Sequence, residues 1–328
     1  MKYREIGHSG IKTTVVGLGT WAAGGDACWG SQDDAITIRA IQEAIDRGIN
    51  LIDTAPAYGF GHSERLVGKA IQGHARDQLV ISTKCGLWWD DDEGAPFLFR
   101  DGKQIYRNLS KRTIKKECET SLKNLGTDYI DIYITHWQSM EPFKTPISET
   151  MEALLELKQE GKIRAIGISN VEPQHVEEYT ACGQIDLIQE KYSMLDRGIE
   201  KQLLPMAKEK GITMQAYSPL EKGLLTGRFK MDTPLSPEDV RNKTSWYQPE
   251  KRAKVLAMLD SWKDLCEAHD CTLSNLVVAW TIEQYDKMSV LCGGRKSSHI
   301  IENVKGGEVS LSADELARMR RDVEALGE

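Results

Sequence analysis

The sequence predicts an α/β protein that folds as a single (β/α)8 barrel over residues 1–328. Eight short apolar segments alternate along the chain with segments of helical periodicity, which is the order expected of a parallel barrel. Neither a linker nor a low-complexity stretch interrupts this alternation. A chain of 328 residues, 40% of them hydrophobic, can bury the core that one large barrel needs.

The predicted strands are apolar on both faces and do not alternate between apolar and polar residues. That pattern is typical of parallel strands that helices cover on the outside. The strands are expected at residues 15–21, 50–55, 79–86, 129–137, 165–170, 186–193, 213–220 and 289–295.

The helical segments carry apolar stripes and recognisable ends. The first, at residues 31–48, begins with a capping-box pattern of Ser31 and Asp34 and stops at Gly48. Two later segments, 110–126 and 147–162, repeat the design. The expected buried stripes are Ile36, Ala40, Ile41, Ala44 and Ile45, then Ile114, Cys118, Leu122 and Leu125, then Met151, Leu154 and Leu155.

Two connections are longer than the rest, at residues 86–109 and 221–250. Both follow the carboxyl ends of strands, the third and the seventh, and barrel enzymes build their sites at that end. The acidic run at residues 90–93 is expected to be a solvated loop tip. A last helix at residues 312–326 follows the eighth unit and is expected to pack against the outside.

Composition excludes several kinds of partner. A net charge of −7 argues against nucleic acid and anionic membranes, and leaves small molecules and proteins open. Seven cysteines without a CxxC pair indicate reduced thiols and no metal site. The first residues lack an apolar signal region and no apolar run reaches membrane length, so a cytoplasmic protein is expected.

Polar side chains end three neighbouring strands of the predicted barrel. Asp53, Lys84 and His136 stand at the ends of strands two, three and four, and Tyr58 lies on the loop after strand two. Considered separately, Asp53 and Lys84 could be an ordinary buried ion pair, His136 a histidine of the core, and Tyr58 a residue that only packs in its turn. Together at one mouth they indicate an active site.

A chemical role for each of the four can be stated. A phenol has a reference pKa of about 10, so it needs help to exchange a proton near neutral pH. A lysine cation beside it favours the phenolate and lowers the pKa, and Asp53 can balance the buried Lys84. Tyr58 would then serve as general acid–base, with His136 hydrogen-bonded to the substrate oxygen.

Aromatic residues near the same mouth are candidates for pocket walls. Trp21 and Trp137 end strands one and four, and Trp88, Trp89 and Phe97 lie on the first long connection. The segment "GLGTWA" at residues 17–22 fits the dinucleotide fingerprint of Rossmann folds by letter. No helix opens directly after it, so the match is interpreted as incidental.

The chain resembles the aldo-keto reductases over nearly its whole length. The similar segments are "GLGTW", "GINLIDTAPAYGFGHSERLVGKAI", "ISTK", "DYIDIYITHW", "IRAIGISN", "QAYSPL" and "GGRKSSHIIEN". By this resemblance, Asp53, Tyr58, Lys84 and His136 match the catalytic tetrad of the family. The implied reaction moves a hydride between a nicotinamide and a carbonyl or alcohol. The polar long connection and the aromatic residues near the mouth favour a sugar, polyol or small aldehyde as the substrate.

The resemblance also implies the cofactor contacts. Ser169, Asn170 and Gln189 match positions that hold the nicotinamide carboxamide, and Tyr217 matches the aromatic residue that stacks on the nicotinamide ring. The remaining expected cofactor residues are Thr20, Trp21, Asp53, Ser218, Pro219, Leu220, Gly293, Gly294, Arg295, Lys296, Ser297, His299, Glu302 and Asn303. The expected substrate contacts are Trp21, Tyr58, Trp88, His136 and Trp137.

NADP(H) is the expected cofactor, with NAD(H) as a possible second. Arg295 can grip an adenosine 2′-phosphate with a planar fork of donors, and Lys296 and Ser297 follow it. Departures from the family pattern occur at Gln138, Lys191 and His299, which puts the pocket shape and the adenine contacts in question.

Two other functions stay open. The first is a cofactor-binding regulatory subunit, similar to the potassium-channel β subunits that share this fold. The second is a lyase or isomerase in which Lys84 forms a Schiff base and no dinucleotide takes part.

Overall fold

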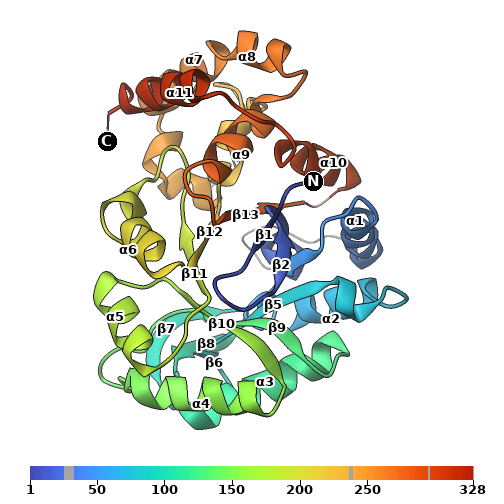
Figure 1. The fold of residues 1–328 in the computed structure, drawn as a ribbon, viewed down its shortest axis with the longest axis vertical. Helices are drawn as coiled ribbons and strands as arrows, with labels where there is room; N and C mark the ends of the chain where they lie inside the picture. The colour runs from blue at the N-terminus through green and yellow to red at the C-terminus, as the bar shows by residue number, and fades with distance from the viewer. Residues whose placement is uncertain (26–32, 236–238, 295, 328) are drawn as a thin grey trace.

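Eight parallel strands close into a barrel in the computed structural model, which describes residues 1–25, 33–235, 239–294 and 296–327. The strands follow one another in chain order around the barrel, and β13 pairs with β3 to close it (Figure 1). All eight strands expected from the sequence are confirmed. They are β3 (Val16–Gly19), β4 (Leu51–Asp53), β5 (Val80–Cys85), β9 (Ile130–Thr135), β10 (Ile163–Ser169), β11 (Leu187–Lys191), β12 (Thr213–Tyr217) and β13 (Met288–Gly293).

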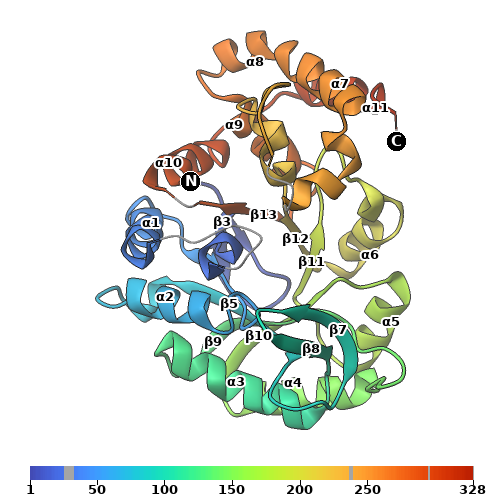
Figure 2. The same ribbon diagram turned by 180° about the vertical axis from the view of Figure 1, so that it is seen from behind.

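Helices surround this barrel, as Figures 1 and 2 show from opposite sides. Those lying around the strands are α1 (Asp34–Asp46), α2 (His62–Ala70), α3 (Lys111–Leu125), α4 (Ile147–Gln159), α5 (Pro173–Cys182), α6 (Leu203–Lys210), α9 (Leu273–Ile282) and α10 (Ser297–Gly306). Three more, α7 (Pro249–Asp260), α8 (Lys263–Ala268) and α11 (Ala313–Glu324), gather at one end of the molecule. The last helix therefore packs outside the barrel, where Trp262 donates a hydrogen bond to Asp322.

The buried stripes differ slightly from the expected ones. Ile36 in α1 is 38% exposed and Leu155 in α4 is 39% exposed, so both were wrongly expected in the core. Each lies at the edge of an otherwise correct stripe, where helix rotation and not residue type decides burial. The α1 N-cap is Asp33, whose side chain accepts from the Ala35 backbone, and Ser31 lies outside the described residues.

A short N-terminal hairpin, absent from the sequence expectations, fills the barrel end opposite the carboxyl ends of the strands. It pairs β1 (Tyr3–Glu5) with β2 (Lys12–Thr14). Ile6 and Ile11 of its connection pack with barrel-interior residues such as Leu187. At its turn, the Gly7 backbone N–H donates to Thr213 Oγ1 over 2.8 Å. A Cβ on Gly7 would stand 2.4 Å from the Asp186 carbonyl oxygen, so this close approach requires glycine.

The first long connection contains a three-stranded antiparallel sheet in the order β6-β8-β7, whose strands are labelled in Figure 1. Its strands are β6 (Leu87–Trp88), β7 (Ala95–Arg100) and β8 (Lys103–Arg107). The second long connection holds the 3-10 turns η4 (Glu221–Thr226), η5 (Val240–Lys243) and η6 (Ser245–Tyr247). The acidic run 90–93 is exposed as predicted, and its carboxylates form ion pairs with Arg112 and Lys116.

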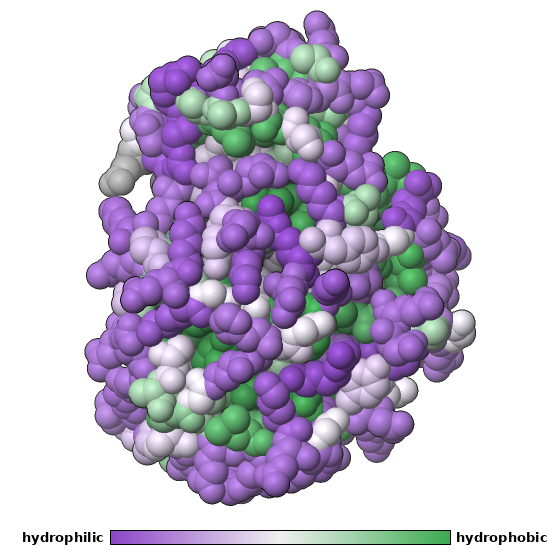
Figure 3. Space-filling view, viewed as in Figure 1, coloured by the Kyte–Doolittle hydropathy of each residue, from purple (hydrophilic) through white to green (hydrophobic). Residues whose placement is uncertain are grey.

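No helix within the described residues is long and apolar enough to cross a membrane. The face of the molecule in Figure 3 is mostly hydrophilic, with hydrophobic residues in small areas. Six cysteines lie in the described part of the chain, all as free thiols, and Cys28 lies outside it. In that same part, no group of histidines, cysteines and carboxylates is arranged to hold a metal ion.

Candidate active site

Three adjacent barrel strands bring the four predicted catalytic residues together. Asp53 ends β4, Lys84 lies near the end of β5, and His136 directly follows β9. Lys84 Nζ lies 2.7 Å from Asp53 Oδ1 and 3.3 Å from the Tyr58 hydroxyl oxygen. The rings of Tyr58 and His136 meet edge to face, with centroids 5.9 Å apart. The phenol therefore stands between an ammonium group and an imidazole.

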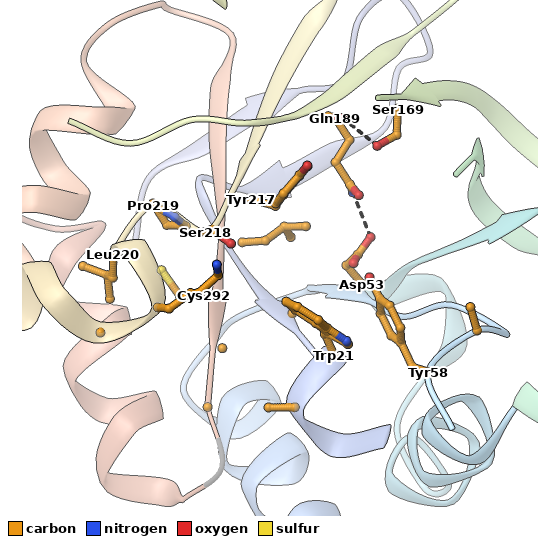
Figure 4. A pocket seen from close by; sticks show the side chains of 18 of the residues that line it. Trp21, Asp53, Tyr58, Ser169, Gln189, Tyr217, Ser218, Pro219, Leu220 and Cys292 are labelled. Carbon is orange, nitrogen blue, oxygen red and sulfur yellow. Dashed lines mark hydrogen bonds between the residues drawn. The ribbon is translucent and has the colours of Figure 1, made fainter. Parts of the chain in front are cut away.

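Asp53 and Lys84 are held from behind by further hydrogen bonds. Asp53 Oδ2 accepts from Ser82 Oγ over 2.9 Å. It also accepts from Gln189 Nε2 over 3.0 Å, the bond drawn between these two residues in Figure 4. Lys84 Nζ also donates to the Thr54 carbonyl oxygen over 2.8 Å. The ammonium group thus has three fixed acceptors, one of which is the phenol.

The backbone around Tyr58 is fixed by close contact between two loops. Gly59 has φ +65°, and a Cβ there would stand 2.2 Å from the carbonyl oxygen of Gly24. In return, a Cβ on Gly24 would stand 2.9 Å from the Tyr58 carbonyl carbon. The loop that carries Tyr58 and the 3-10 turn η1 (Trp21–Gly24) therefore require glycine at Gly59 and at Gly24, where their backbones meet.

Burial and neighbouring charges shift the pKa values of this group. Burial works to lower the pKa of Lys84, but Asp53 and Tyr58 outweigh it and the pKa is raised. Burial raises the pKa of Tyr58, while Lys84 acts in the lowering direction. The expected net lowering of the phenol pKa is therefore wrong in this structure, although the direction of the lysine effect is as predicted. Burial, Lys84 and Arg100 lower the pKa of His136 well below its usual value, so its imidazole is neutral.

A cavity of about 610 Å³ extends from these residues to the start of α10. Figure 4 shows Tyr58 and Trp21 on one side of it and Leu220 and Cys292 on the other. The predicted site residues that line it are Trp21, Asp53, Tyr58, His136, Trp137, Ser169, Asn170, Gln189, Tyr217, Ser218, Pro219, Leu220, Gly293, Gly294, His299, Glu302 and Asn303. One continuous space thus joins the proton-active residues to the segment that follows β13.

Several predicted residues lie elsewhere. Thr20 is buried, and its hydroxyl donates to the Asp53 carbonyl oxygen over 2.9 Å, so it supports the site from behind. Lys84 lies beneath Tyr58 and is only 1% exposed. Lys296 and Ser297 are exposed and do not line the cavity, and Arg295 lies outside the described residues.

Trp88 does not occupy the place that the sequence interpretation gave it. The residue is 3% exposed, and its indole N–H donates to Asp91 Oδ1 over 2.5 Å. Arg112 and Lys116 lie over its ring, with the Lys116 Nζ 4.8 Å from the ring centroid. The alternation of a strand turns neighbouring side chains to opposite faces, so Leu87 lines the cavity and Trp88 does not.

Polar groups in the middle of the cavity are linked to one another. Tyr217 OH donates to Asn170 Oδ1 over 2.9 Å, and Asn170 Nδ2 donates to the His136 carbonyl oxygen over 2.7 Å. Gln189 Nε2 bonds to Gln215 Oε1 as well as to Asp53. These amides and hydroxyls beside an aromatic ring fit the carboxamide and ring of a nicotinamide.

The far end of the cavity fits the rest of a dinucleotide. A Cβ on Gly293 would meet nothing within 4 Å, so a ligand can approach the backbone there. Asn303 Nδ2 donates to the Gly293 carbonyl oxygen over 3.0 Å and holds this segment against α10. The N-terminus of α10 follows directly, and such an end favours negative charge.

The three departures from the family pattern occupy different positions. Gln138 is buried beneath the pocket, where its amide accepts from Tyr179 OH and donates to the Ser169 carbonyl oxygen. Lys191 forms ion pairs with Glu221 and Asp196. His299 alone lines the cavity, so it alone can alter the contacts of a ligand directly.

Other cavity residues escaped the sequence interpretation. Leu98, Arg100 and Ile105 reach the cavity from the three-stranded sheet, and Lys222 and Arg228 reach it from the second long connection. The dipeptide Asp101–Gly102, a strong hairpin signal, could have indicated the two strands that flank it.

Proton-active side chains grouped at the carboxyl ends of barrel strands are the arrangement typical of an enzyme. The sequence model of the Aldo/keto reductase family matches residues 15–323, and the chain belongs to that family.

Several proteins are similar to this chain over nearly its whole length. The chain is 47% identical to the NADH-specific methylglyoxal reductase of Escherichia coli (strain K12), an alignment that covers 99% of both chains. Among solved structures, it is similar to a glycerol dehydrogenase from Gluconobacter oxydans, with 34% identity, a TM-score of 0.87 and coverage of 98% and 94%. It also resembles an aldo-keto reductase from Klebsiella pneumoniae in complex with NADPH, with 27% identity, a TM-score of 0.72 and coverage of 98% and 95%.

Proposed function

We propose that this protein transfers a hydride between a pyridine nucleotide and a small carbonyl compound or alcohol, with Tyr58 as the acid–base group. The observation that carries this proposal is the position of the Tyr58 hydroxyl. It lies 3.3 Å from the buried Lys84 ammonium and beside the His136 ring, at one end of a cavity of about 610 Å³ that reaches residues of α10.

A bound nicotinamide would supply or accept the hydride. Tyr58 would donate its proton to the substrate oxygen in the reducing direction. Lys84, held by Asp53 at 2.7 Å, would stabilise the phenolate that this leaves, which counteracts part of the effect of burial on the Tyr58 pKa. His136, whose pKa is well below its usual value, would donate a hydrogen bond to the same oxygen without adding charge.

Ser169, Asn170 and Gln189 would hold the carboxamide and Tyr217 would stack on the nicotinamide ring, as the resemblance implies. The links from Gln189 to Asp53 and from Asn170 to the His136 backbone support this assignment. Through them, the residues that orient a nicotinamide would also fix the proton-active group.

The proposed substrate is a small hydroxylated or oxo-substituted aldehyde or ketone. Trp21, Trp137 and Phe97 line the cavity near Tyr58, and aromatic faces suit the C–H groups of such compounds. Two relatives support the size, since their names refer to methylglyoxal and to glycerol, both three-carbon compounds.

The cofactor preference remains a prediction of NADP(H) over NAD(H). It rests on Arg295 and Lys296, which would face an adenosine 2′-phosphate. The relatives differ on this point, because one is named for NADH and another is a complex with NADPH.

The proposal is tested by mixing the purified protein with NADH or NADPH and a panel of methylglyoxal, glyceraldehyde, simple aldehydes and sugars. Oxidation of the nicotinamide is followed by its absorbance, and glycerol with the oxidised cofactor tests the reverse direction. Turnover that depends on Tyr58 supports the proposal. Cofactor binding without turnover on any member would instead support a regulatory subunit.

The Schiff-base alternative fits the structure poorly. An amine must be neutral and accessible to attack a carbonyl, but Lys84 is 1% exposed and ion-paired, and its pKa is raised. Borohydride with a keto substrate should leave Lys84 unmodified, whereas a trapped secondary amine would overturn the proposed role.

A further inference from the structure

The sheet β6-β8-β7 covers the substrate end of the cavity and carries one arginine into it. Leu98 and Arg100 of β7 line the cavity, and Phe99 between them is 70% exposed, as strand alternation requires. A register shift between Pro96 and Leu98 places Phe97 on the cavity side as well. Strand β7 therefore presents two apolar side chains and one guanidinium to the cavity, and Leu87 of β6 and Ile105 of β8 add two more apolar side chains from the same sheet.

Arg100 is placed by a tight turn. It pairs with Lys103 across the hairpin, and the two residues between them, Asp101 and Gly102, have φ values of +47° and +78°. Two residues with positive φ form the short hairpin loop whose twist matches its flanking strands. Arg100 thus projects from the end of an ordered strand and not from an irregular loop.

The charge of Arg100 acts at the proposed reaction site. Together with burial and Lys84, it lowers the pKa of His136, and it acts in the same direction on the pKa of Tyr58. Both groups face the position proposed for the substrate oxygen. Arg100, Tyr58 and His136 line the same cavity, so a ligand held there can contact the guanidinium while its reacting oxygen lies at Tyr58.

The other described cations that line the cavity lie toward its nucleotide end. Arg228 forms an ion pair with Glu302, and Lys222 donates to Thr244 Oγ1 over 3.3 Å. Lys222 and Arg228 follow Ser218, Pro219 and Leu220, the residues after β12 that the family resemblance assigns to the dinucleotide. Arg100 differs from them because it comes from the sheet that covers the substrate end.

We propose that Arg100 is a specificity-determining residue that binds an anionic group of the substrate, a carboxylate or a phosphate. The preferred substrates are then small aldehydes or ketones that carry such a group a few bonds from the carbonyl. This inference rests on the proposed function. A guanidinium offers paired N–H donors that match the oxygens of both anions, and the apolar walls around it strengthen the interaction. No covalent change occurs at Arg100, so the hydride and proton steps stay as proposed.

Matched substrate pairs test the inference directly. One pair is 4-oxobutanoate and its methyl ester, and the other is glyceraldehyde 3-phosphate and glyceraldehyde. In the unmodified protein, kcat/KM for the charged member of at least one pair should be about 10- to 100-fold higher, the size of a charged hydrogen bond. Arg100→Met should remove most of this preference, chiefly by raising KM for the charged member.

Lys103→Met provides the matched control. Lys103 faces Arg100 across the hairpin and its Nζ lies 4.8 Å from the Phe60 ring centroid, but it does not line the cavity. The preference should survive this change and should survive in part in Arg100→Lys, which keeps the charge. Thermal unfolding of each variant checks that the fold is retained.

The two substrate pairs also distinguish recognition of a carboxylate from recognition of a phosphate. If Arg100 binds a carboxylate, Arg100→Met should abolish the preference for 4-oxobutanoate over its methyl ester; if it binds a phosphate, Arg100→Met should abolish the preference for glyceraldehyde 3-phosphate over glyceraldehyde. Equal kcat/KM within both pairs in the unmodified protein would overturn the inference. So would an equal loss on charged and neutral members in Arg100→Met. If the neutral members are reduced in a Tyr58-dependent way without any charge preference, this inference alone fails; if no member of either pair is reduced, the proposed function itself fails.

Discussion

Asp53 and Lys84 form an ion pair at 2.7 Å, and their side chains are only 3% and 1% exposed. Charges so far from water are stable only as a pair, because removing one partner leaves the other without compensation. The ion pair therefore links the stability of the fold to the proposed catalysis. Lys84, the cation proposed to assist the proton donor Tyr58, can be buried only because Asp53 balances its charge.

Asp53→Asn should destabilise the protein by about 3–5 kcal/mol, the usual cost of leaving a buried charge unpaired. Chemical denaturation of the variant measures this change. The double variant Asp53→Asn with Lys84→Met removes both charges and should recover part of the stability while activity stays low. Equal stability of Asp53→Asn and the unmodified protein would show that the pair contributes nothing to the fold.

Tyr58→Phe should slow hydride transfer by about 10²- to 10⁴-fold, because the ring remains but the proton donor is lost. Single-turnover kinetics isolates that step from product release. The dissociation constant of the cofactor should hardly change, since the proposed nicotinamide contacts lie on β10, β11 and β12. A near-normal hydride step in this variant would exclude Tyr58 as the acid–base group.

Lys84→Met should depress turnover and shift the pH profile. Lys84 acts to lower the Tyr58 pKa, so its removal should raise the apparent pKa of the acid–base group. Alcohol oxidation requires the phenolate, and its rate should therefore rise at higher pH in the variant than in the unmodified protein. A profile that does not move, or that moves toward lower pH, would contradict this role.

His136 should make the protein less stable in acid. Its folded-state pKa is well below the ordinary value of about 6.5, so below that pH the unfolded chain binds a proton that the folded protein does not. Stability from this residue is full above about pH 6.5 and falls on acidification by up to about 1.4 kcal/mol per pH unit until the folded pKa is reached. Urea unfolding at a series of pH values across this range should show that the free energy of unfolding falls less steeply on acidification in His136→Gln than in the unmodified protein. Parallel curves would argue that His136 is charged in the fold.

NADPH should bind more tightly than NADH. Arg295→Ala should reduce the difference between their binding free energies by about 1.5–3 kcal/mol, the value of a hydrogen bond to a charged group. NADH lacks the 2′-phosphate, so its dissociation constant should change little. Fluorescence titration of both cofactors measures the four constants. Equal affinities of the unmodified protein for the two cofactors would defeat the prediction. Tighter binding of NADH would also defeat it, and would match the NADH specificity in the name of one relative.

Local patterns predicted the barrel strands well. Parallel strands that are buried on both faces have continuous apolar sequences, and all eight of the apolar segments identified in the sequence form strands. The N-terminal hairpin and the sheet over the cavity gave no such runs, because their strands are short and only partly buried. In β7, for example, Phe99 is exposed while Ala95 is buried, a pattern that depends on what the sheet covers.

The candidate site was predictable where strand ends determined it and unpredictable where packing did. Asp53, Lys84 and His136 converge because neighbouring parallel strands end at one mouth. Trp88 and Leu87 could not be told apart in advance, since a shift of one residue exchanges the two faces of a strand. The direction of the Tyr58 pKa shift depends on how deeply the side chain is buried, and the identity of the residue does not reveal its burial.

The contact between Gly7 and Thr213 has a consequence for the order in which the chain folds. The two residues are separated by 206 positions, and β3 finds its second neighbour only in β13. The hairpin leaves the ribosome long before its docking partners, which are synthesised much later. The barrel can close only when nearly the whole chain is available, so its formation should be slow and should expose the edge of β3 in the meantime. During that interval, strand-edge pairing with other chains competes with folding, and chaperone dependence should be greatest before β13 emerges.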